Sequence, residues 1–221
     1  MDCHKVCNSD MTDRHRKRPD GGFHKSGKNA YLRGMEFTGI LRRRYGLSEE
    51  AAGLLMQDAA EAHYARKELI VEEGQRDQDV RFVAEGSVRT YVMREDKCVI
   101  LSFSFEGDPA TSTLGTLPGG VSRHTIETME PTTLVSIPRA RIDELFSTNV
   151  ELADWGRRMA EEQLRRHEDY FAEFSWMEKS RQYELMLREN PELLQRVALK
   201  DLAAYLFLTP QSLSRIRAEK K

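Results

Sequence analysis

The last part of the chain reads "LKDLAAYLFLTPQSLSRIR" over residues 199–217, a pattern typical of two short helices joined by a turn. Thr209 is a good N-cap, and Pro210 suits the first helical turn, where a missing N–H costs nothing. We therefore predict one helix over residues 198–206 and a second that begins at Pro210 and runs to about residue 217. Their spacing supplies a shared apolar core of Leu202, Leu206, Leu213 and Ile216. This is the spacing of a helix-turn-helix motif, whose second helix lies in a DNA major groove.

Composition limits the class of protein. The chain has 221 residues, of which 39% are hydrophobic, so it can hold one large domain or two small ones. No uncharged apolar run approaches the roughly 20 residues of a membrane span, and the N-terminus lacks the apolar core of a signal peptide. The three cysteines, Cys3, Cys7 and Cys98, make no disulfide framework. We expect a cytoplasmic protein with no membrane partner.

Charge is distributed unevenly along the chain. The net charge is −2, yet residues 195–221 carry six Lys and Arg against two Asp and Glu, whereas residues 35–194 carry 20 against 30. A basic C-terminal patch on an acidic protein is what a phosphate-contacting surface would look like. Residues 1–30 have few apolar residues and no period, so we expect residues 1–34 to be a disordered leader, or one that is expression-derived or misassigned.

The middle of the chain has the pattern of short strands. Six runs rich in Val, Ile, Thr and aromatic residues are bounded by Gly, Pro or acidic turns: "LIVEEG" (69–74), "VRFVAEG" (80–86), "SVRTYVM" (87–93), "CVILSFSF" (98–105), "HTIETM" (124–129) and "TTLVSI" (132–137). Closely spaced short strands predict an antiparallel barrel or jelly roll. Residues 35–70 precede them with apolar residues at helical spacing, and Ser48 followed by Glu49 and Glu50 marks a helix start.

After residue 138 the strand pattern stops. Residues 139–187 form one long run of helix formers, which we interpret as a helix that pairs with its copy in a homodimer. Apolar residues at three-and-four spacing mark the expected dimer interface: Leu152, Trp155, Met159 and Tyr170. The alternative is that this helix packs on its own barrel.

The order of these elements resembles the Crp/Fnr family of bacterial transcription regulators over roughly residues 36–217. The ending quoted above is especially similar to family members common in Bacteroidetes. The resemblance implies an α+β fold with an N-terminal antiparallel β jelly roll of the cyclic-nucleotide-binding type, a long dimerisation helix and a C-terminal helix-turn-helix. The corresponding divisions are 1–34 for the leader, 35–140 for the effector-sensing barrel with its N-terminal helix, 141–178 for the dimerisation helix and 179–221 for the DNA-binding domain.

The resemblance also implies roles in the second helix of the motif. Pro210, Gln211 and Arg215 occupy the positions that read bases, and a guanidinium can bond guanine O6 and N7 together. Lys200, Thr209 and Ser212 are candidates for phosphate contacts. Phe207 stands where the family usually has glycine. Because a bulky residue takes positive φ at a cost, we expect either a distorted turn or Phe207 packed on the barrel.

The family's cyclic-nucleotide cassette corresponds here to "ILSFSFEGDPATSTLGTLPGGVSRHTI", residues 100–126. Thr111 and Ser112 occupy the place of the family's Gly-Glu pair for the ribose, and Ser122 occupies the place of its phosphate-binding arginine. Arg123 comes one residue later, which in a strand turns its side chain to the opposite face. These residues, with Asp108, mark the effector pocket, but the missing anchors disfavour a cyclic nucleotide.

Other chemistries find little support in the sequence. Three cysteines are too few for the four thiolates of a typical iron–sulfur cluster, and no residue pattern marks a metal or haem site. No glycine-rich phosphate loop, HExxH or GxSxG motif is present, so we expect no catalytic residues, no resident cofactor and no enzymatic activity.

We therefore expect a dimeric, sequence-specific transcription regulator whose effector is an unidentified small molecule or absent. The expected partners are double-stranded DNA with a pseudo-palindromic site and a second copy of the chain, and RNA polymerase is an additional partner that the resemblance allows. Two alternatives stay open: a genuine cyclic-nucleotide-responsive regulator, and a sensor or interaction protein with a vestigial DNA-binding motif.

Overall fold

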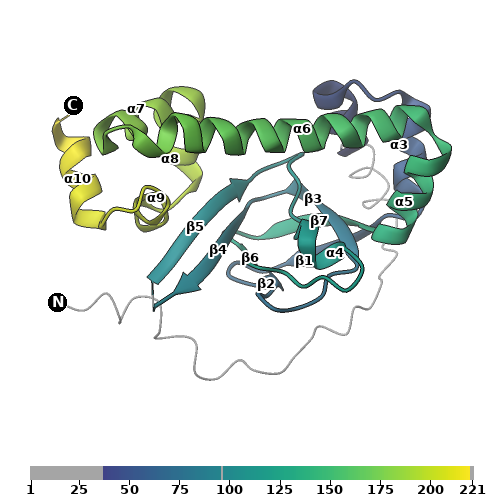
Figure 1. Cartoon of the computed structure of the whole chain (residues 1–221), viewed down its shortest axis with the longest axis horizontal. Coiled ribbons are helices and arrows are strands. Elements are labelled where there is room, and N and C mark those ends of the chain that lie inside the picture. Colours follow the sequence, from purple (N-terminus) through teal and green to yellow (C-terminus); the bar gives the residue numbers. More distant parts are fainter. Residues whose placement is uncertain (1–36, 96, 220–221) are drawn as a thin grey trace.

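The computed structural model describes residues 37–95 and 97–219. Figure 1 shows two layers of strands with the long helix α6 crossing one side and the C-terminal helices gathered at one end. The strands are β1 (Ala60–Tyr64), β2 (Leu69–Val71), β3 (Asp79–Glu85), β4 (Val88–Arg94), β5 (Lys97–Ser104), β6 (Thr125–Thr128) and β7 (Thr132–Pro138). The helices are α3 (Glu49–Met56), α4 (Thr113–Thr116), α5 (Arg139–Thr148), α6 (Val150–Ala172), α7 (Lys179–Glu189), α8 (Glu192–Arg196), α9 (Leu199–Tyr205) and α10 (Pro210–Glu219), with a 3-10 turn, η1 (Phe174–Trp176). Residues 37–45 are also helical.

The strands form two antiparallel sheets. One has the order β1-β7-β3 and the other the order β2-β6-β4-β5. All six expected strand runs contain a strand, and the predicted α+β fold with an antiparallel jelly roll is confirmed. The sequence pattern predicts helix for residues 60–64, but this segment is strand β1, paired with β7. Its run "AEAHY" has little β propensity of its own, so pairing with β7 decides its conformation.

The long helical run is divided rather than continuous. Asn149 separates α5 from α6, and its side-chain carbonyl accepts a hydrogen bond from the Leu152 N–H at 2.9 Å, capping α6. Gly156 lets the two helices meet closely, since a Cβ there would overlap the Phe146 ring. A second break at η1 separates α6 from α7. The predicted helix over residues 141–178 is therefore wrong in its bounds, because an N-cap and a 3-10 turn end what helix propensity alone would continue.

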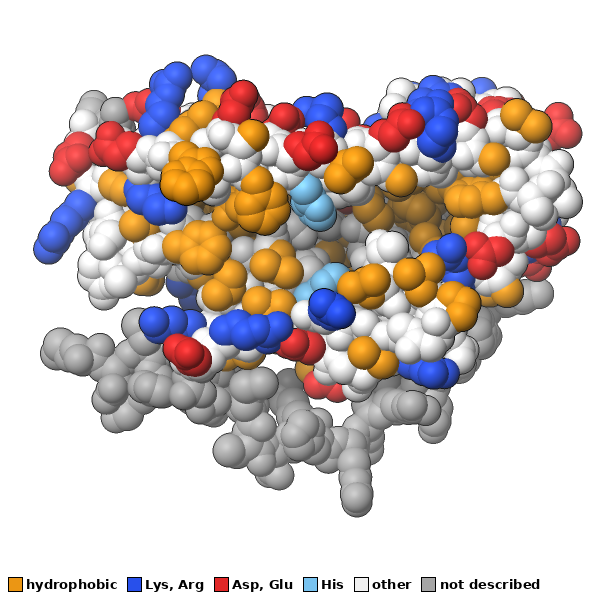
Figure 2. All heavy atoms as spheres, in the orientation of Figure 1, with side chains coloured by type: hydrophobic (Ala, Val, Ile, Leu, Met, Phe, Trp, Pro, Cys, Tyr) orange, Lys and Arg blue, Asp and Glu red, His pale blue; other side chains and the backbone are white. Residues whose placement is uncertain are grey.

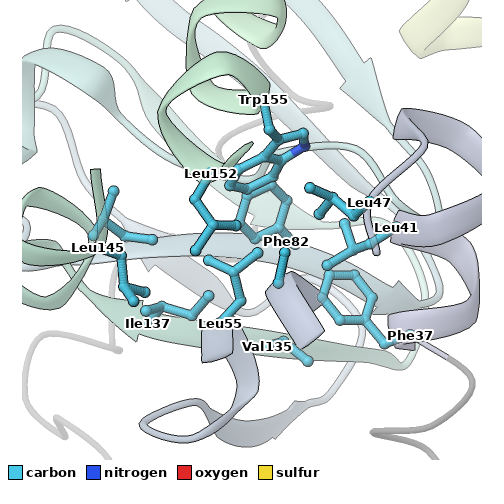
Figure 3. Packing of buried hydrophobic residues seen from close by; sticks show 12 residues of the cluster. Phe37, Leu41, Leu47, Leu55, Phe82, Val135, Ile137, Leu145, Leu152 and Trp155 are labelled. Carbon is cyan, nitrogen blue, oxygen red and sulfur yellow. The ribbon is translucent and has the colours of Figure 1, made fainter. Parts of the chain in front are cut away.

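The main core lies where α6 and the N-terminal helices meet the β3–β7 sheet. Figure 3 shows Trp155 and Leu152 of α6 pointing at Phe82, Leu55 and Leu47. Leu152 is 0% exposed and Trp155 is 2% exposed. Both belong to the predicted dimer interface, and both are wrong as interface residues because the chain's own core already buries them. Met159 also packs against this core, and Tyr170 contacts the rings of Phe171 and Phe174 of its own chain.

The leader predicted for residues 1–34 lies outside the described residues. Among the described helices, none combines the length and the apolar character that crossing a membrane requires.

Candidate DNA-binding and sensor sites

The C-terminal helices form the predicted helix-turn-helix. Leu202, Leu206 and Leu213 are 0–1% exposed and pack together with Ala203, the small residue between α9 and α10. Thr209 starts the second helix, since its Oγ1 accepts a hydrogen bond from the Ser212 N–H at 3.1 Å. The bounds of α9 and α10 agree with the predicted helices to within about two residues.

Phe207 occupies the turn with a φ of +57°, in the left-handed region. Its ring is 57% exposed and lies under the Lys179 ammonium, 5.6 Å from the ring centroid. Of the two expectations for this residue, packing on the barrel is wrong. The turn instead takes the conformation that glycine would adopt, with a bulky residue in it, at a cost on the order of 1–3 kcal/mol.

The residues predicted to contact DNA lie on and around α10. Lys200, Thr209, Gln211 and Arg215 are exposed, and Pro210 and Ser212 are half-buried. The Ser212 hydroxyl lies 2.9 Å from the Thr209 hydroxyl, so both side chains take part in the helix cap. Within the described part of the chain Arg215 makes no ion pair, and its guanidinium is free for an external acceptor.

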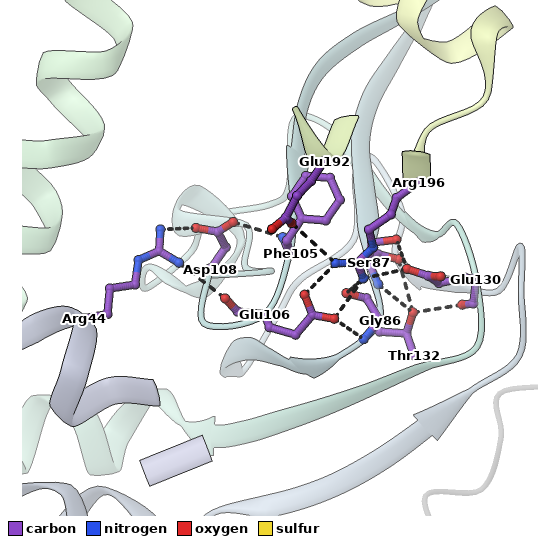
Figure 4. Close-up of polar contacts among 10 residues, drawn as sticks. All are labelled: Arg44, Gly86, Ser87, Phe105, Glu106, Asp108, Glu130, Thr132, Glu192 and Arg196. Carbon is purple, nitrogen blue, oxygen red and sulfur yellow. Dashed lines mark hydrogen bonds and ion pairs between the residues drawn. The ribbon is translucent and has the colours of Figure 1, made fainter. Parts of the chain in front are cut away.

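A cluster of charged side chains that the sequence did not reveal, Arg196 with Glu106 and Glu130, connects the C-terminal helices to the barrel; we call this cluster the joint. Arg196, at the end of α8, donates to both carboxylate oxygens of Glu106 at 2.7 and 2.8 Å and to Glu130 at 2.7 Å. It also donates to the Gly86 carbonyl at 2.9 Å and lies over the Phe105 ring. Figure 4 shows the barrel loops converging on this one guanidinium. The joint ties three loops of the barrel to the helix that precedes the helix-turn-helix.

The pKa values of the two carboxyl groups reflect this arrangement. Burial by itself would raise the pKa of Glu106, but bonds from Arg196 and from the Gly86 N–H outweigh it and lower the pKa. Burial would likewise raise the pKa of Glu130, and the bonds from Ser87 and Arg196 lower it below its ordinary value. Both groups are therefore ionised at neutral pH.

A second contact joins α9 to the outer face of the β4–β6 pair. Arg89 donates to Asp201 of α9 at 2.7 Å and to Glu127 of β6 at 3.1 Å. The aromatic rings of Phe103 and Tyr205 lie beside it, with centroids 5.6 Å apart. The joint around Arg196 and this contact hold the helix-turn-helix against the barrel, together with the packing of Phe103, Phe105 and Met129 on its apolar core.

The side chains predicted for the effector pocket are engaged within the barrel. The Thr111 hydroxyl exchanges hydrogen bonds with the backbone of Arg81, and the Ser112 hydroxyl caps α4 by accepting from the Gly115 N–H. The Ser122 hydroxyl donates to the His124 carbonyl at 2.6 Å. Arg123 is exposed. The three hydroxyls at the anchor positions are thus bonded to the chain's own backbone.

Asp108, the fifth of them, lies elsewhere. Its carboxylate accepts from Arg44 at 2.6 Å and from the Phe105 N–H at 2.9 Å, which links the turn after β5 to the helix over residues 37–45. Sequence spacing could not reveal this contact, because its partners are 64 residues apart.

The exposed side of α6 carries a different apolar row from the predicted one. Leu164 is 59% exposed and Phe171 is 68% exposed. With the exposed Ala160 and His167 they form a row at positions 160, 164, 167 and 171, which are four, three and four residues apart. Figure 2 shows hydrophobic side chains gathered on the visible face between α6 and strands β4 and β5. This row is the exposed apolar side of α6, whereas Leu152 and Trp155 are buried in the chain's own core.

Comparison with known proteins agrees with the geometry. Residues 61–149 match the cyclic nucleotide-binding domain family. FixK2 from Bradyrhizobium japonicum is a similar solved structure, with a TM-score of 0.60, 24% identity and coverage of 73% of this chain and 83% of that one. A CooA mutant from Carboxydothermus hydrogenoformans has a TM-score of 0.64, 17% identity and coverage of 81% and 83%. The Thermus thermophilus catabolite activator protein has a TM-score of 0.52, 18% identity and coverage of 81% and 85%.

No curated protein sequence matches the chain. Residues 61–149 are thus similar to cyclic nucleotide-binding domains, and the chain has the fold of solved Crp/Fnr transcription regulators.

Proposed function

We propose that this protein is a dimeric, sequence-specific DNA-binding transcription regulator of the Crp/Fnr type, acting in the cytoplasm, and not an enzyme. The observation that carries the proposal is the exposed start of α10, where Gln211 and Arg215 project from a helix held by a buried core. An exposed guanidinium one turn after a capped helix start has the geometry to read a guanine in the major groove.

The exposed row on α6 supports a homodimer. Ala160, Leu164, His167 and Phe171 repeat at heptad spacing, which places them along one line of the helix for a second copy of α6 to meet. Two recognition helices then contact successive major grooves, so the site is a pseudo-palindrome with half-sites roughly 34 Å apart. RNA polymerase is the partner that a DNA-bound regulator of this type would meet next.

The proposed effector of the barrel is not a cyclic nucleotide. The hydroxyls at the anchor positions, of Thr111, Ser112 and Ser122, already bond to the chain's own backbone, and a ribose and a cyclic phosphate need a carboxylate and a guanidinium. The match of residues 61–149 to the cyclic nucleotide-binding domain favours the opposite view, a cyclic-nucleotide-responsive regulator. Thermal unfolding with cyclic AMP or cyclic GMP separates the two. We expect no rise in Tm, and a rise that Arg123→Ala removes would favour the cyclic nucleotide.

Selection of DNA from a random pool tests the proposal. We expect an enriched inverted repeat, and Arg215→Ala should weaken its binding by about 1–3 kcal/mol and relax the preference at one base pair. Arg217→Ala is the matched control, because Arg217 is exposed on the same helix but lies two residues on, about 200° around its axis. Absence of enrichment, or equal losses in both variants, would favour an interaction protein with a vestigial DNA-binding motif.

A further inference from the structure

A cavity of about 310 Å³ lies between the helix over residues 37–45 and α6. Its walls include Arg44 and Tyr45 from the first helix and Trp155, Arg158, Glu162 and Arg166 from α6. None of the five residues predicted for the effector pocket lines it. Its volume is at the lower end of the range for small-molecule sites.

The cavity walls are cationic. Three guanidinium groups face one carboxylate, that of Glu162. Arg166 donates to Glu162 through Nε at 2.9 Å, and Arg158 donates to Asp154 through one terminal nitrogen at 2.7 Å. Within the described residues the other N–H groups of these two arginines have no bond to protein, so they can bind an incoming anion.

The cavity also has an aromatic wall with an unsatisfied donor. Trp155 is 2% exposed, and its Nε1–H is buried with no hydrogen-bond partner among the described residues. The Tyr45 ring meets it edge-on, with centroids 6.2 Å apart. Because that nitrogen is itself buried, Trp155 offers the cavity the apolar surface of its ring.

We propose that this cavity binds a small organic anion that carries an aromatic ring. The guanidinium groups of Arg158 and Arg166 bond the anionic group, and the rings of Tyr45 and Trp155 contact the apolar part. A phosphate and a carboxylate share this chemistry.

The cavity is connected to the helix-turn-helix through one turn of the barrel. Arg44, on the cavity wall, donates to the Asp108 carboxylate and to the Glu106 carbonyl, and the Tyr45 hydroxyl donates to the Gly107 carbonyl at 3.2 Å. The side chain of the same Glu106 bonds Arg196 (Figure 4). An anion bound at this wall by Arg158 and Arg166 also competes with Asp108 for the Arg44 guanidinium, and by drawing Arg44 away it loosens the joint that positions the helix-turn-helix. This second step rests on the proposed function, but binding itself does not.

Fluorescence of the full chain tests the site. Trp176 is 85% exposed and is the other tryptophan of the chain, so Trp176→Phe leaves Trp155 as the single reporter. The probes are phenyl phosphate, benzoate and inorganic phosphate, with calorimetry as an independent measurement of binding. We expect phenyl phosphate or benzoate to give a saturable change with a Kd below about 1 mM, and inorganic phosphate to bind more weakly.

Two arginines provide a matched comparison. Arg157 and Arg158 both pair with Asp154 and are both 56% exposed, but only Arg158 lines the cavity. Arg158→Gln should weaken probe binding about tenfold, and Arg157→Gln should leave it unchanged. No saturable change with either aromatic probe at about 10 mM, or equal weakening in both variants, would overturn the site.

Hydrogen exchange tests the connection separately from DNA binding. We expect the aromatic probe that binds to speed exchange in residues 105–108 and in α8, and Arg44→Gln to abolish that change. Binding without any such change would overturn the connection and leave the site standing. A protein that binds the probe but enriches no DNA would refute the proposed function alone.

Discussion

The core around Trp155 and the joint around Arg196 hold the same molecule together by different physics. The core is apolar, and Leu152, Trp155 and Phe82 are 0–2% exposed. The joint is charged, and the side chains of Arg196, Glu106 and Glu130 are 23%, 34% and 38% exposed. Apolar burial is strong and non-directional, whereas ion pairs near water depend on geometry and stabilise less. The barrel and α6 share one apolar core, whereas the helix-turn-helix meets the barrel through this charged joint and through a smaller apolar contact of Phe103, Phe105 and Met129 with its core.

The largest effect is expected from truncating the core side of α6. Leu152→Ala should lower the free energy of unfolding by about 2–5 kcal/mol, because it leaves a cavity at a fully buried position. Leu164→Ala, on the exposed side of the same helix, should change monomer stability by less than about 0.5 kcal/mol but weaken self-association. Urea unfolding and sedimentation measure the two quantities. Equal destabilisation by both variants would contradict the division of α6 into a core side and a partner side.

A smaller effect is expected at the joint. Arg196→Ala should cost about 1–3 kcal/mol, since it leaves two part-buried carboxylates and the Gly86 carbonyl without their donor. Hydrogen exchange should rise in α8 and α9 while the barrel strands stay protected. The control is Arg188→Ala, whose side chain is 67% exposed. Loss of protection throughout the barrel would show that the joint and the core unfold together.

The joint should also weaken in acid. The pKa values of Glu106 and Glu130 in the folded protein lie below their ordinary value of about 4.3. The stability that the two carboxylates contribute is therefore complete above about pH 4.3, and it is lost as the pH falls through the lower pKa values of the folded state. The stability difference between the wild type and Arg196→Ala should therefore be constant from about pH 7 to 5 and shrink below about pH 4. Urea midpoints measured across this range give the difference. A difference that persists unchanged to about pH 3 would refute the role of these carboxylates.

The smallest effect is expected at the turn of the helix-turn-helix. Phe207→Gly relieves the backbone strain of a bulky residue at positive φ, which stabilises the folded state. Glycine also gives the unfolded chain more conformational freedom, which offsets part of that gain, so we expect the free energy of unfolding to rise by about 1 kcal/mol or less. Thermal unfolding measures it, with Leu208→Ala as a comparison at the next position. A clear loss of stability in Phe207→Gly would show that the contact of its ring with Lys179 outweighs the backbone strain.

Patterns that are local in the chain could be predicted from the sequence alone. The six strand runs, the cap at Ser48 and the start of α10 at Thr209 follow from β propensity, side-chain capping and apolar spacing within a few residues. Strand β1 was not predictable in this way, because pairing with β7 overrides local propensity. The start of α6 was missed although its cap at Asn149 is a local signal, because the run of helix formers continues on both sides of it. Leu152 and Trp155 were misassigned, because apolar spacing marks a side of a helix that is covered but does not show whether the chain's own core or a second chain covers it.

The sequence by itself determined the order of the elements, the α+β class and the helix that presents Gln211 and Arg215, because each depends on neighbours within one or two turns or one strand. Only the tertiary structure decided that Leu152 and Trp155 belong to the core. It also decided that Glu106 and Glu130 meet at Arg196, and that Arg44 and Arg158 line the same cavity. These contacts join residues far apart in the chain, and many charged residues were available for each pairing. Which of them meet depends on how the sheets and helices pack.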